Sequence, residues 1–315
     1  MENNSINFQK RIGYYGDITP LLNKVCDDFK IGKYLSHKVV LMGYEDFNLI
    51  LKTSNGKFFI KIFAKFRDKK DCQRYVEIVE HVLKAEVSHP PLYKSPQGYL
   101  YEIKMNETTI RLIVTEYIEG KTFFELNKEP NTEEMSFIVK QATLINSIKL
   151  KPSFVYDNWA ITNFLDQYDK KAQYLDKEDA KLISPLIETF KSLAINNLPH
   201  CFAHGDITKT NTMKDKNGKI YILDFAVANY YPRIQELAVL ICDLLSKNSY
   251  EQILHKYQKY IKLTSDEIKK LPLYVKLAHA MHILCGTYEK KVNHNTSAEN
   301  EYFIKIGRTG LQSLN

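Results

Sequence analysis

The spacing of apolar residues predicts that the first third of the chain is rich in β-strands. Apolar residues that alternate with polar ones, or that form short continuous runs, mark five expected strands at residues 38–42, 48–53, 57–63, 98–104 and 109–117. Ser54-Asn55-Gly56, between the second and third of these strands, is typical of a hairpin turn. Helical spacing is found at 18–29, where Gly32 ends the helix, and at 68–86.

After residue 118 the apolar residues recur mainly at helical spacing. Helices are expected at 133–148, 165–193, 234–245 and across most of 250–314. Asn131 with Glu134, and Thr264 with Glu267, have the spacing of capping boxes at two helix starts. Pro185 predicts that 165–193 is either one long helix or two shorter ones broken near this residue. The pattern indicates an α+β protein whose sheet-rich part is followed by a mainly helical part.

The stretch from His204 to Asp224 carries the clearest candidate chemistry. Asp206 is followed five positions later by Asn211, and an apolar strand then ends in Asp224, thirteen positions after Asn211. This order and spacing are typical of the catalytic loop and the metal-binding aspartate of a kinase. A purely structural interpretation is also open, in which Asp206 and Asn211 cap a turn and Asp224 ends a strand.

On these residues the sequence resembles the superfamily of aminoglycoside phosphotransferases, choline kinases and homoserine kinases. The resemblance implies a bilobal protein-kinase-like fold, with an antiparallel-sheet nucleotide lobe at 1–118 and a mainly helical lobe at 119–315 that carries the catalytic loop and the substrate site. It also implies ATP, or GTP, and magnesium as cofactors. In this interpretation Asp206 accepts the proton of the acceptor hydroxyl, and His204 shapes the loop through hydrogen bonds. Asn211 and Asp224 would hold the metal.

Lys61 lies within the strongly apolar run 57–63. A buried lysine without an anion nearby is costly, so Lys61 either faces an anion or lies on the exposed face of an edge strand. The resemblance implies the first alternative, a strand lysine that binds the nucleotide phosphates and pairs with a helix glutamate. Glu77 and Glu80 are both candidates, because residues three apart share a helix face. Glu77 is preferred, because the family places this glutamate about two turns before the helix ends.

Two further segments are assigned to the nucleotide by the resemblance alone. Residues 43–48 correspond to the loop that folds over the phosphates, with Asn48 facing them, although a plain hairpin turn is the alternative. Residues 115–120 correspond to the hinge between the lobes. There the adenine bonds backbone groups, which we place near Glu116 and Ile118.

Several residues depart from the pattern of a protein kinase or extend it. Gly205 stands where many protein kinases have arginine, and Ala226 replaces the glycine that follows the Asp-Phe pair. These departures favour a small-molecule kinase.

Three further residues have expected roles. Lys209, inside the loop, would meet an anionic group or the transferred phosphate. Glu236 is expected to brace the catalytic loop, and Trp159, the single tryptophan, either belongs to the core or stacks on the substrate.

The composition and the N-terminal residues indicate the expected cellular location. The five cysteines are scattered without a CxxC pair, as expected for reduced, buried thiols of a cytoplasmic protein. No signal-peptide pattern is visible in residues 1–10, and no apolar run is long enough to span a bilayer. The net charge of +7 is spread over mixed runs, which fits solubility or a nucleotide-binding cleft, and no nucleic-acid partner is expected.

The predicted function is ATP-dependent phosphorylation of a hydroxyl on a small molecule. An amino alcohol, a hydroxy amino acid, a sugar and an aminoglycoside are all candidate acceptors, and the lack of an obvious acidic cluster in the C-terminal part disfavours the aminoglycoside. The alternatives are a kinase-like protein that acts on a protein or lipid, and a nucleotide-binding module without turnover. The intact set of Asp206, Asn211 and Asp224 argues against the last. The acceptor, the choice between ATP and GTP, and the oligomeric state are left open.

Overall fold

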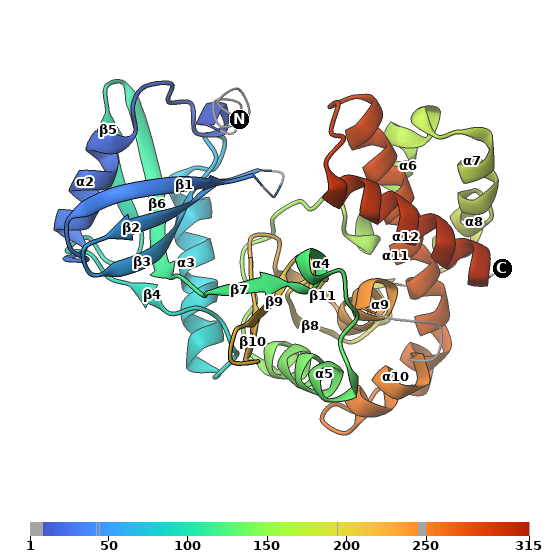
Figure 1. Ribbon diagram of the computed structural model, residues 1–315. Coiled ribbons are helices and arrows are strands. Elements are labelled where there is room, and N and C mark those ends of the chain that lie inside the picture. Colours follow the sequence, from blue (N-terminus) through green and yellow to red (C-terminus); the bar gives the residue numbers. More distant parts are fainter. Residues whose placement is uncertain (1–8, 42, 44, 194, 245–249, 315) are drawn as a thin grey trace. The chain divides into compact units, whose positions relative to one another are not determined.

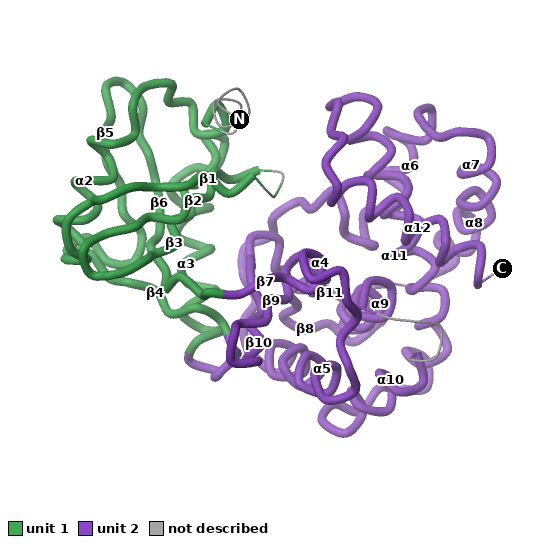
Figure 2. The backbone as a smooth tube through the Cα atoms, viewed as in Figure 1, with its two compact units in different colours: residues 1–83, 89–119 green, residues 84–88, 120–315 purple. Residues whose placement is uncertain are grey.

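The computed structural model describes residues 9–314, except for 42, 44, 194 and 245–249 (Figure 1). The chain forms two compact units (Figure 2). The first contains residues 1–83 and 89–119, and the second contains residues 84–88 and 120–315. The sequence suggested a single division after residue 118. In the structure the short segment 84–88 belongs with the second unit.

An antiparallel sheet forms the centre of the first unit. Its order is β1-β2-β3-β6-β4, and β5 pairs with β6. The strands are β1 (Tyr34–Val40), β2 (Phe47–Thr53), β3 (Gly56–Ile62), β4 (Leu92–Tyr93), β5 (Tyr101–Met105) and β6 (Thr108–Glu116). The two helices are α2 (Thr19–Asp28) and α3 (Lys69–Lys84), preceded by a 3₁₀ turn at Lys10–Ile12. The five predicted strands and both predicted helices are confirmed within a few residues, although Met42 lies outside the described residues.

Alternation along β2 and β3 gives the sheet two chemically different faces. One face packs with α2 in a continuous apolar core that includes Leu49 and Ile60. Asn48 and Lys61 are opposite each other in the register of β2 and β3, so their side chains lie together on the other face. α3 covers that face, since the ring centroid of its Tyr75 lies 5.4 Å from Lys61 Nζ.

The second unit is mainly helical, with two small antiparallel ribbons at its centre. β7 (Gly120–Thr122), β9 (Thr212–Asp215) and β10 (Ile220–Ile222) form one ribbon, and β8 (His200–Ala203) pairs with β11 (Asn229–Pro232) in the other. The helices are α4 (Phe123–Leu126), α5 (Thr132–Ser147), α6 (Phe164–Lys171), α7 (Lys177–Ile183), α8 (Pro185–Lys191), α9 (Arg233–Leu244), α10 (Tyr250–Gln258), α11 (Ser265–Lys291) and α12 (Ala298–Leu314). Short 3₁₀ turns lie at Ile161–Asn163, Ala172–Tyr174 and Ile195–Asn197.

The long helix α11 organises the packing of this unit. Its side chains are buried along most of the stretch from Leu271 to Thr287, and α6, α9 and α12 pack against it. A helix that is apolar on nearly all sides is stable only when neighbours surround it. This arrangement places residues from distant parts of the sequence around the same helix (Figure 1).

The helix-start signals are confirmed, and one helix boundary is not. Asn131 and Thr264 form capping boxes with Glu134 and Glu267 at the starts of α5 and α11. Residues 165–193 form three helices, because the chain breaks before Asp176 as well as at Ser184-Pro185. The Asp176 side chain accepts a hydrogen bond from the Asp179 amide and so caps a new helix, α7.

The cysteines and the lengths of the helices bear on the expected cellular setting. Cys26, Cys72, Cys242 and Cys285 are free and buried, and Cys201 is free and partly exposed. Among the described residues, no helix combines the length and the hydrophobicity needed to cross a bilayer. The cytoplasmic location stays a prediction.

Candidate active site

Two short ribbons of the second unit hold the stretch from His204 to Asp224. β8 ends directly before His204, and the β9–β10 hairpin begins after Asn211 and ends before Leu223. The Leu223 amide donates a hydrogen bond to the Asn211 carbonyl at 2.8 Å. This bond closes the hairpin and brings Asp224, the next residue, to the same end as Asn211.

His204 is completely buried and holds the loop through both ring nitrogens. Nε2 donates to the Leu223 carbonyl at 2.9 Å, and Nδ1 accepts from the Asp206 amide at 3.1 Å. These partners require the neutral ring with its proton on Nε2. Burial lowers the pKa of His204 to about 4, although the Leu223 hydrogen bond and Asp224 act in the opposite direction. His204 is therefore neutral at physiological pH and shapes the loop, as the sequence predicted.

Gly205 and Glu236 form a second support. Gly205 has φ +82°, a left-handed conformation that glycine adopts without strain and arginine does not. Its amide donates to Glu236 Oε2 at 2.8 Å. Burial raises the pKa of Glu236 to about 7, and the hydrogen bond from Gly205 works against this rise. The predicted bracing contact from the start of α9 is confirmed.

Asn211 orients the Asp206 carboxylate directly. Its Nδ2 donates to Asp206 Oδ2 at 2.6 Å and to the Asp206 carbonyl at 3.1 Å. The two residues are five positions apart, and the intervening turn is closed by further backbone hydrogen bonds. Both contacts use the amide nitrogen, so the amide oxygen of Asn211 takes no part in them.

The charges of four other acidic residues act on Asp206. Burial raises the pKa of its carboxyl well above the usual range, and the negative charges of Asp157, Asp224, Asp243 and Glu299 raise it further. Asp157, Asp243 and Glu299 are far in sequence from the loop that begins at His204. The sequence shows no obvious acidic cluster in the C-terminal part, whereas the fold brings negative charges from separate segments to act on Asp206.

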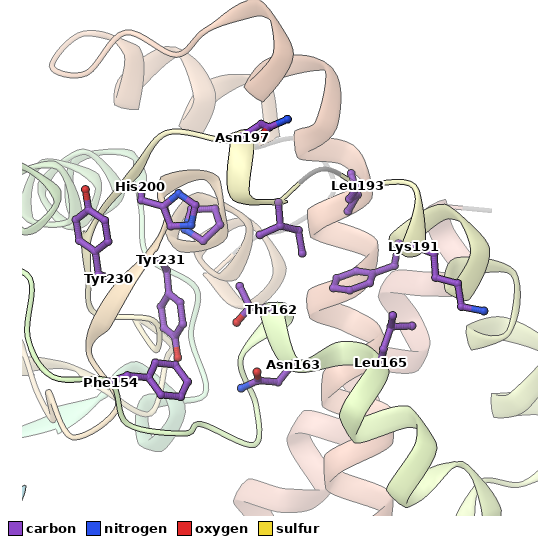
Figure 3. Close-up of a pocket in the computed structure, with 13 residues that line it drawn as sticks. Phe154, Thr162, Asn163, Leu165, Lys191, Leu193, Asn197, His200, Tyr230 and Tyr231 are labelled. Carbon is purple, nitrogen blue, oxygen red and sulfur yellow. The ribbon is translucent and has the colours of Figure 1, made fainter.

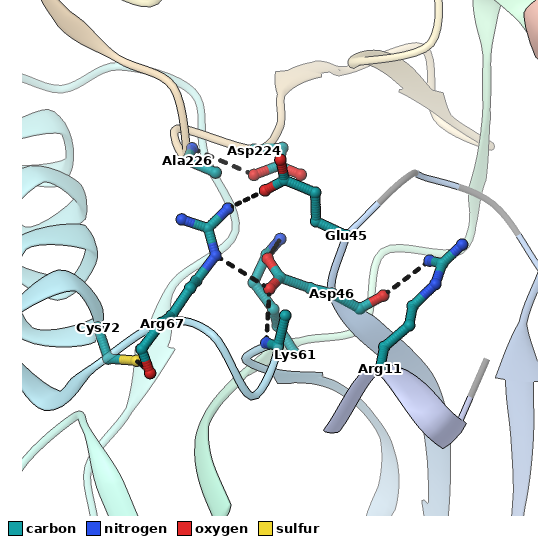
Figure 4. A network of polar contacts seen from close by, with 9 residues as sticks. Arg11, Glu45, Asp46, Lys61, Arg67, Cys72, Asp224 and Ala226 are labelled. Atoms are coloured by element: carbon teal, nitrogen blue, oxygen red, sulfur yellow. Dashed lines mark hydrogen bonds and ion pairs between the residues drawn. The ribbon is translucent and has the colours of Figure 1, made fainter. Parts of the chain in front are cut away.

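Asp224 has an uncommon backbone conformation. Its φ is +59°, in the left-handed region that few residues other than glycine adopt. The carboxylate Oδ1 accepts a hydrogen bond from the Ala226 amide at 3.2 Å (Figure 4). Local strain of this kind gathers at functional sites, where the surrounding structure enforces it.

Asp243 is a buried residue of α9 that the sequence did not single out. Its carboxylate accepts hydrogen bonds from the Lys209 amide and, at 3.0 Å, from the Tyr302 hydroxyl. Burial raises the pKa of Asp243 to about 6, and the Lys209 amide opposes the rise. The Lys209 ammonium lies 3.9 Å from Glu129 Oε1. Asp243 is 34 residues after Lys209, so no local pattern indicates the contact.

In the first unit, Lys61 forms a buried ion pair with Asp46 (Figure 4). Lys61 Nζ lies 2.9 Å from Asp46 Oδ2, and the two side chains are 6% and 4% exposed. Asp46 Oδ1 also accepts from the Ala64 amide at 2.9 Å and from Arg67 Nε at 3.2 Å. Lys61 and Arg67 lower the pKa of this carboxyl against the effect of burial, so Asp46 is charged.

The predicted pair between Lys61 and Glu77 is wrong. Glu77 and Glu80 are both exposed on α3, whereas Tyr75, Ile78 and other residues form the buried side of that helix. The acid comes instead from the segment between β1 and β2. Helical spacing showed that Glu77 and Glu80 could share a face, but it did not show which way that face points.

The other nucleotide residues inferred from the resemblance lie in the first unit. Asn48 lies beside Lys61 on the same face of the sheet, and its Oδ1 is buried with no hydrogen-bond partner among the described residues. Glu116 ends β6, and its amide donates to the Pro91 carbonyl at 3.0 Å. Ile118 is buried in the segment that follows. Their roles in nucleotide binding stay predictions.

A cavity of about 630 Å³ lies elsewhere in the second unit (Figure 3). Phe154, His200, Tyr230 and Tyr231 form its aromatic side, and residues of α6 and α8 form the opposite side. None of the predicted site residues lines it. Trp159 does not line it either, since its ring packs 5.5 Å from Phe303 and 6.1 Å from His282. These neighbours favour a core role for the tryptophan.

The candidate metal ligands are oxygen atoms of one amide and one carboxylate. In residues 9–314, apart from the gaps stated above, no three His, Cys, Asp or Glu side chains are grouped to hold a metal ion by themselves. Magnesium commonly binds one or two carboxylates together with substrate phosphates and water. Asn211 and Asp224 suit that kind of site, because they offer hard oxygen donors at one end of a hairpin.

Comparison with known proteins identifies related sequences and folds. The chain matches the model of APH, the phosphotransferase enzyme family, over residues 37–266. A homoserine kinase from Agrobacterium fabrum (strain C58 / ATCC 33970) is 20% identical over 278 residues, which is 82% of each protein.

Solved structures of small-molecule kinases have the same fold. A microcompartment-associated aminopropanol kinase superposes with a TM-score of 0.70 at 10% identity, covering 95% of this chain and 96% of the other. A choline kinase from Streptococcus pneumoniae has a TM-score of 0.64 at 16% identity, with 94% and 99% covered. Spectinomycin phosphotransferase, solved with ADP and spectinomycin, has a TM-score of 0.67 at 12% identity, with 92% and 97% covered. The predicted kinase-like α+β fold is confirmed.

Proposed function

The chain belongs to the phosphotransferase enzyme family, and we propose that the stretch from His204 to Asp224 is its catalytic centre. The enzyme transfers a phosphoryl group from a nucleoside triphosphate to a hydroxyl group of a small molecule. The observation that carries the assignment is the pair of hydrogen bonds by which Asn211 holds Asp206, while the hairpin brings Asp224 to the same end. A kinase needs such a fixed set, because phosphoryl transfer depends on positioning and charge neutralisation.

Asp206 is the proposed catalytic base. Its carboxylate would accept the proton of the acceptor hydroxyl and orient that hydroxyl. The high pKa of Asp206 arises from burial and from neighbouring acids, so a bound cation would return the group to its charged form. His204 and Glu236 act only through the loop, by fixing the backbone on either side of Gly205.

Asn211 and Asp224 are the proposed magnesium ligands. Magnesium would neutralise the phosphate charge and bind with one amide oxygen, one carboxylate and the phosphate oxygens. The strained backbone of Asp224 and the hydrogen-bonded side chain of Asn211 support this assignment, because both residues are held in place before any ligand binds.

Lys61 is the proposed contact for the nucleotide phosphates, and Asp46 is its positioning residue. Asp46 replaces the helix glutamate in our interpretation, because it forms the buried ion pair with Lys61 and also holds Arg67. Asn48 lies beside Lys61 with an unpaired buried amide oxygen, which fits a polar ligand at this face of the sheet. Glu116 and Ile118 are proposed to offer backbone groups to the adenine.

We further propose that the acceptor carries an amino or ammonium group as well as the hydroxyl. The negative charges of Asp157, Asp243 and Glu299 add to that of Asp206 and favour a cation close to the base. Homoserine, aminopropanol, choline and spectinomycin, which are named for the related proteins, all combine a hydroxyl with such a group. A neutral sugar would bring no positive charge to these carboxylates.

An ATP-consumption screen tests both proposals. Release of ADP is measured with magnesium and a panel of homoserine, choline, ethanolamine, aminopropanol and spectinomycin, beside glycerol and glucose as neutral counterparts. We expect turnover with at least one cationic acceptor and its loss in Asp206→Ala. Turnover by Asp206→Ala at the wild-type rate would overturn the catalytic assignment. Turnover with the neutral compounds alone would overturn the acceptor class.

A further inference from the structure

Lys171, the last residue of α6, is buried beside a cysteine. The side chain is 6% exposed, and its Nζ lies 3.3 Å from Cys285 Sγ on α11. On another side Nζ lies 4.9 Å from the ring centroid of Tyr288. Within the described part of the chain, no carboxylate comes within ion-pair distance of this amine. A buried lysine without an acid is costly, so the sulfur is its main polar partner.

Cys285 has two polar neighbours at once. It is completely buried, and its Sγ donates to the carbonyl of Asn158 at 3.1 Å while accepting from Lys171. Burial raises the pKa of Cys285 to about 12, with Lys171 acting against the rise, so the group is a thiol. Among the five free cysteines, Cys285 is the one with a lysine amine in hydrogen-bond contact. The amine and the sulfur are close enough for a single oxygen atom to bridge them once both have been oxidised.

We propose that Lys171 and Cys285 are a redox-sensitive modification site that closes into a nitrogen–oxygen–sulfur bridge. One molecule of hydrogen peroxide oxidises the thiol to a sulfenic acid and is reduced to water. The Lys171 ammonium releases its proton to solvent, and a second peroxide converts the resulting amine to a hydroxylamine, again with release of water. Condensation of the hydroxylamine with the sulfenic acid expels a third water and forms the N–O–S link. Sulfur and nitrogen each lose two electrons, and the two peroxides gain four.

The bridge would tie α6 to α11 and change the contacts of the loop before α6. It removes the S–H donor from the Asn158 carbonyl and the charge from Lys171. Asn158 follows Asp157, whose carboxylate lies close enough to act on the charge of Asp206. Oxidation of Cys285 would therefore change the electrostatic environment of Asp206. The modification itself does not depend on the proposed function, since it involves no residue of the catalytic loop.

Peptide mass spectrometry after peroxide treatment tests the proposal. The reduced, purified chain is treated with hydrogen peroxide, digested without reductant and compared with the same sample after dithiothreitol. We expect a cross-linked peptide that joins Lys171 to Cys285, heavier by one oxygen and lighter by two hydrogens, and lost on reduction. The Tm should rise on oxidation and return on reduction, because the link constrains the unfolded chain as a disulfide does.

Matched variants keep the test decisive. Lys171→Met retains Cys285 and fills the same buried space, and Cys285→Ser retains the amine, so neither should give the cross-link or the reversible rise in Tm. Cys201, which is partly exposed, reports that the peroxide reached the protein. Three results would overturn the proposal: oxidation of Cys201 without the cross-link, a direct N–S bond without the oxygen, or a cross-link that persists in Lys171→Met.

Discussion

Lys61 and Asp46 form an ion pair at 2.9 Å in which both side chains are almost completely buried. Such a pair fixes the position of the ammonium group, because Asp46 is itself held by the Ala64 amide and by Arg67. Removing one partner of a buried pair leaves an uncompensated charge, which typically costs roughly 3–5 kcal/mol. Lys61 is therefore placed by the segment before β2, and α3 contributes the aromatic ring of Tyr75 beside it.

Substitution of Asp46 should impair phosphoryl transfer, and substitution of Glu77 should not. We expect Asp46→Asn and Lys61→Met each to lower kcat/KM for ATP by at least about tenfold, a loss of roughly 1.4 kcal/mol of transition-state stabilisation. Glu77→Gln and Glu80→Gln are matched controls on the exposed side of α3 and should stay near wild type. Steady-state kinetics with varied ATP, together with circular dichroism to verify folding, make the comparison. Tighter ATP binding by Asp46→Asn would mean that Asp46 competes with the nucleotide.

Substitution of Asp206 should separate turnover from binding. Asp206→Asn keeps the size of the side chain, but the amide cannot take up the proton of the substrate hydroxyl as a carboxylate does. We expect turnover to fall at least about a hundredfold, the lower range for general-base catalysis, with ATP and magnesium affinity nearly unchanged. The nucleotide Kd and kcat are measured on one preparation with the acceptor found in the screen. Loss of nucleotide binding as well would show that Asp206 holds the metal.

Magnesium dependence should follow Asp224 and Asn211. Titration calorimetry with a non-hydrolysable ATP analogue should show tighter binding with magnesium in the wild type, and this gain should shrink in Asp224→Ala and Asn211→Ala. Each variant is also titrated without metal, where its affinity should match that of the wild type. An undiminished magnesium effect in Asp224→Ala would remove this residue from the metal site.

The buried histidines of α11 should make stability depend on pH. Burial lowers the pKa of His282 to about 3 and that of His279 to about 4, whereas both titrate near 6.5 when unfolded. Between these values the unfolded chain binds more protons, so each histidine removes up to about 1.4 kcal/mol of stability per pH unit as the pH falls below about 6.5. Buried acids such as Glu236, whose pKa is raised to about 7, act with the opposite sign.

The difference between two proteins isolates the histidine effect. Urea unfolding of wild type and His282→Gln is compared from about pH 4 to about pH 7, so that the contributions of the acids cancel. The stability of the wild type should fall relative to the variant by about 1.4 kcal/mol per unit as the pH decreases below about 6.5. Parallel curves would show that His282 has the same pKa in the folded and unfolded protein, which would contradict the prediction.

Local sequence was sufficient to predict the positions of the proposed catalytic residues and the elements that carry them. Asp206 and Asn211 lie in one short loop, and the β9–β10 hairpin that follows brings Asp224 back to the same end. The relative positions of the three residues are therefore set by one loop and one hairpin. The strands of the first unit and the caps at Asn131 and Thr264 are equally local. Periodicity and turn chemistry act over a few residues, and for this reason they are visible in a single sequence.

Only the tertiary structure decided which distant side chains became partners. Lys61 meets Asp46 and not Glu77, the backbone amide of Lys209 meets the Asp243 carboxylate, and Lys171 meets Cys285, at separations of 15, 34 and 114 residues. Helical spacing shows which residues share a face of a helix, but it does not show which face is buried. Burial of the apolar side of α3 leaves Glu77 exposed to solvent. The set of negative charges that act on Asp206 has the same origin, because packing around α11 brings together segments that no local pattern relates.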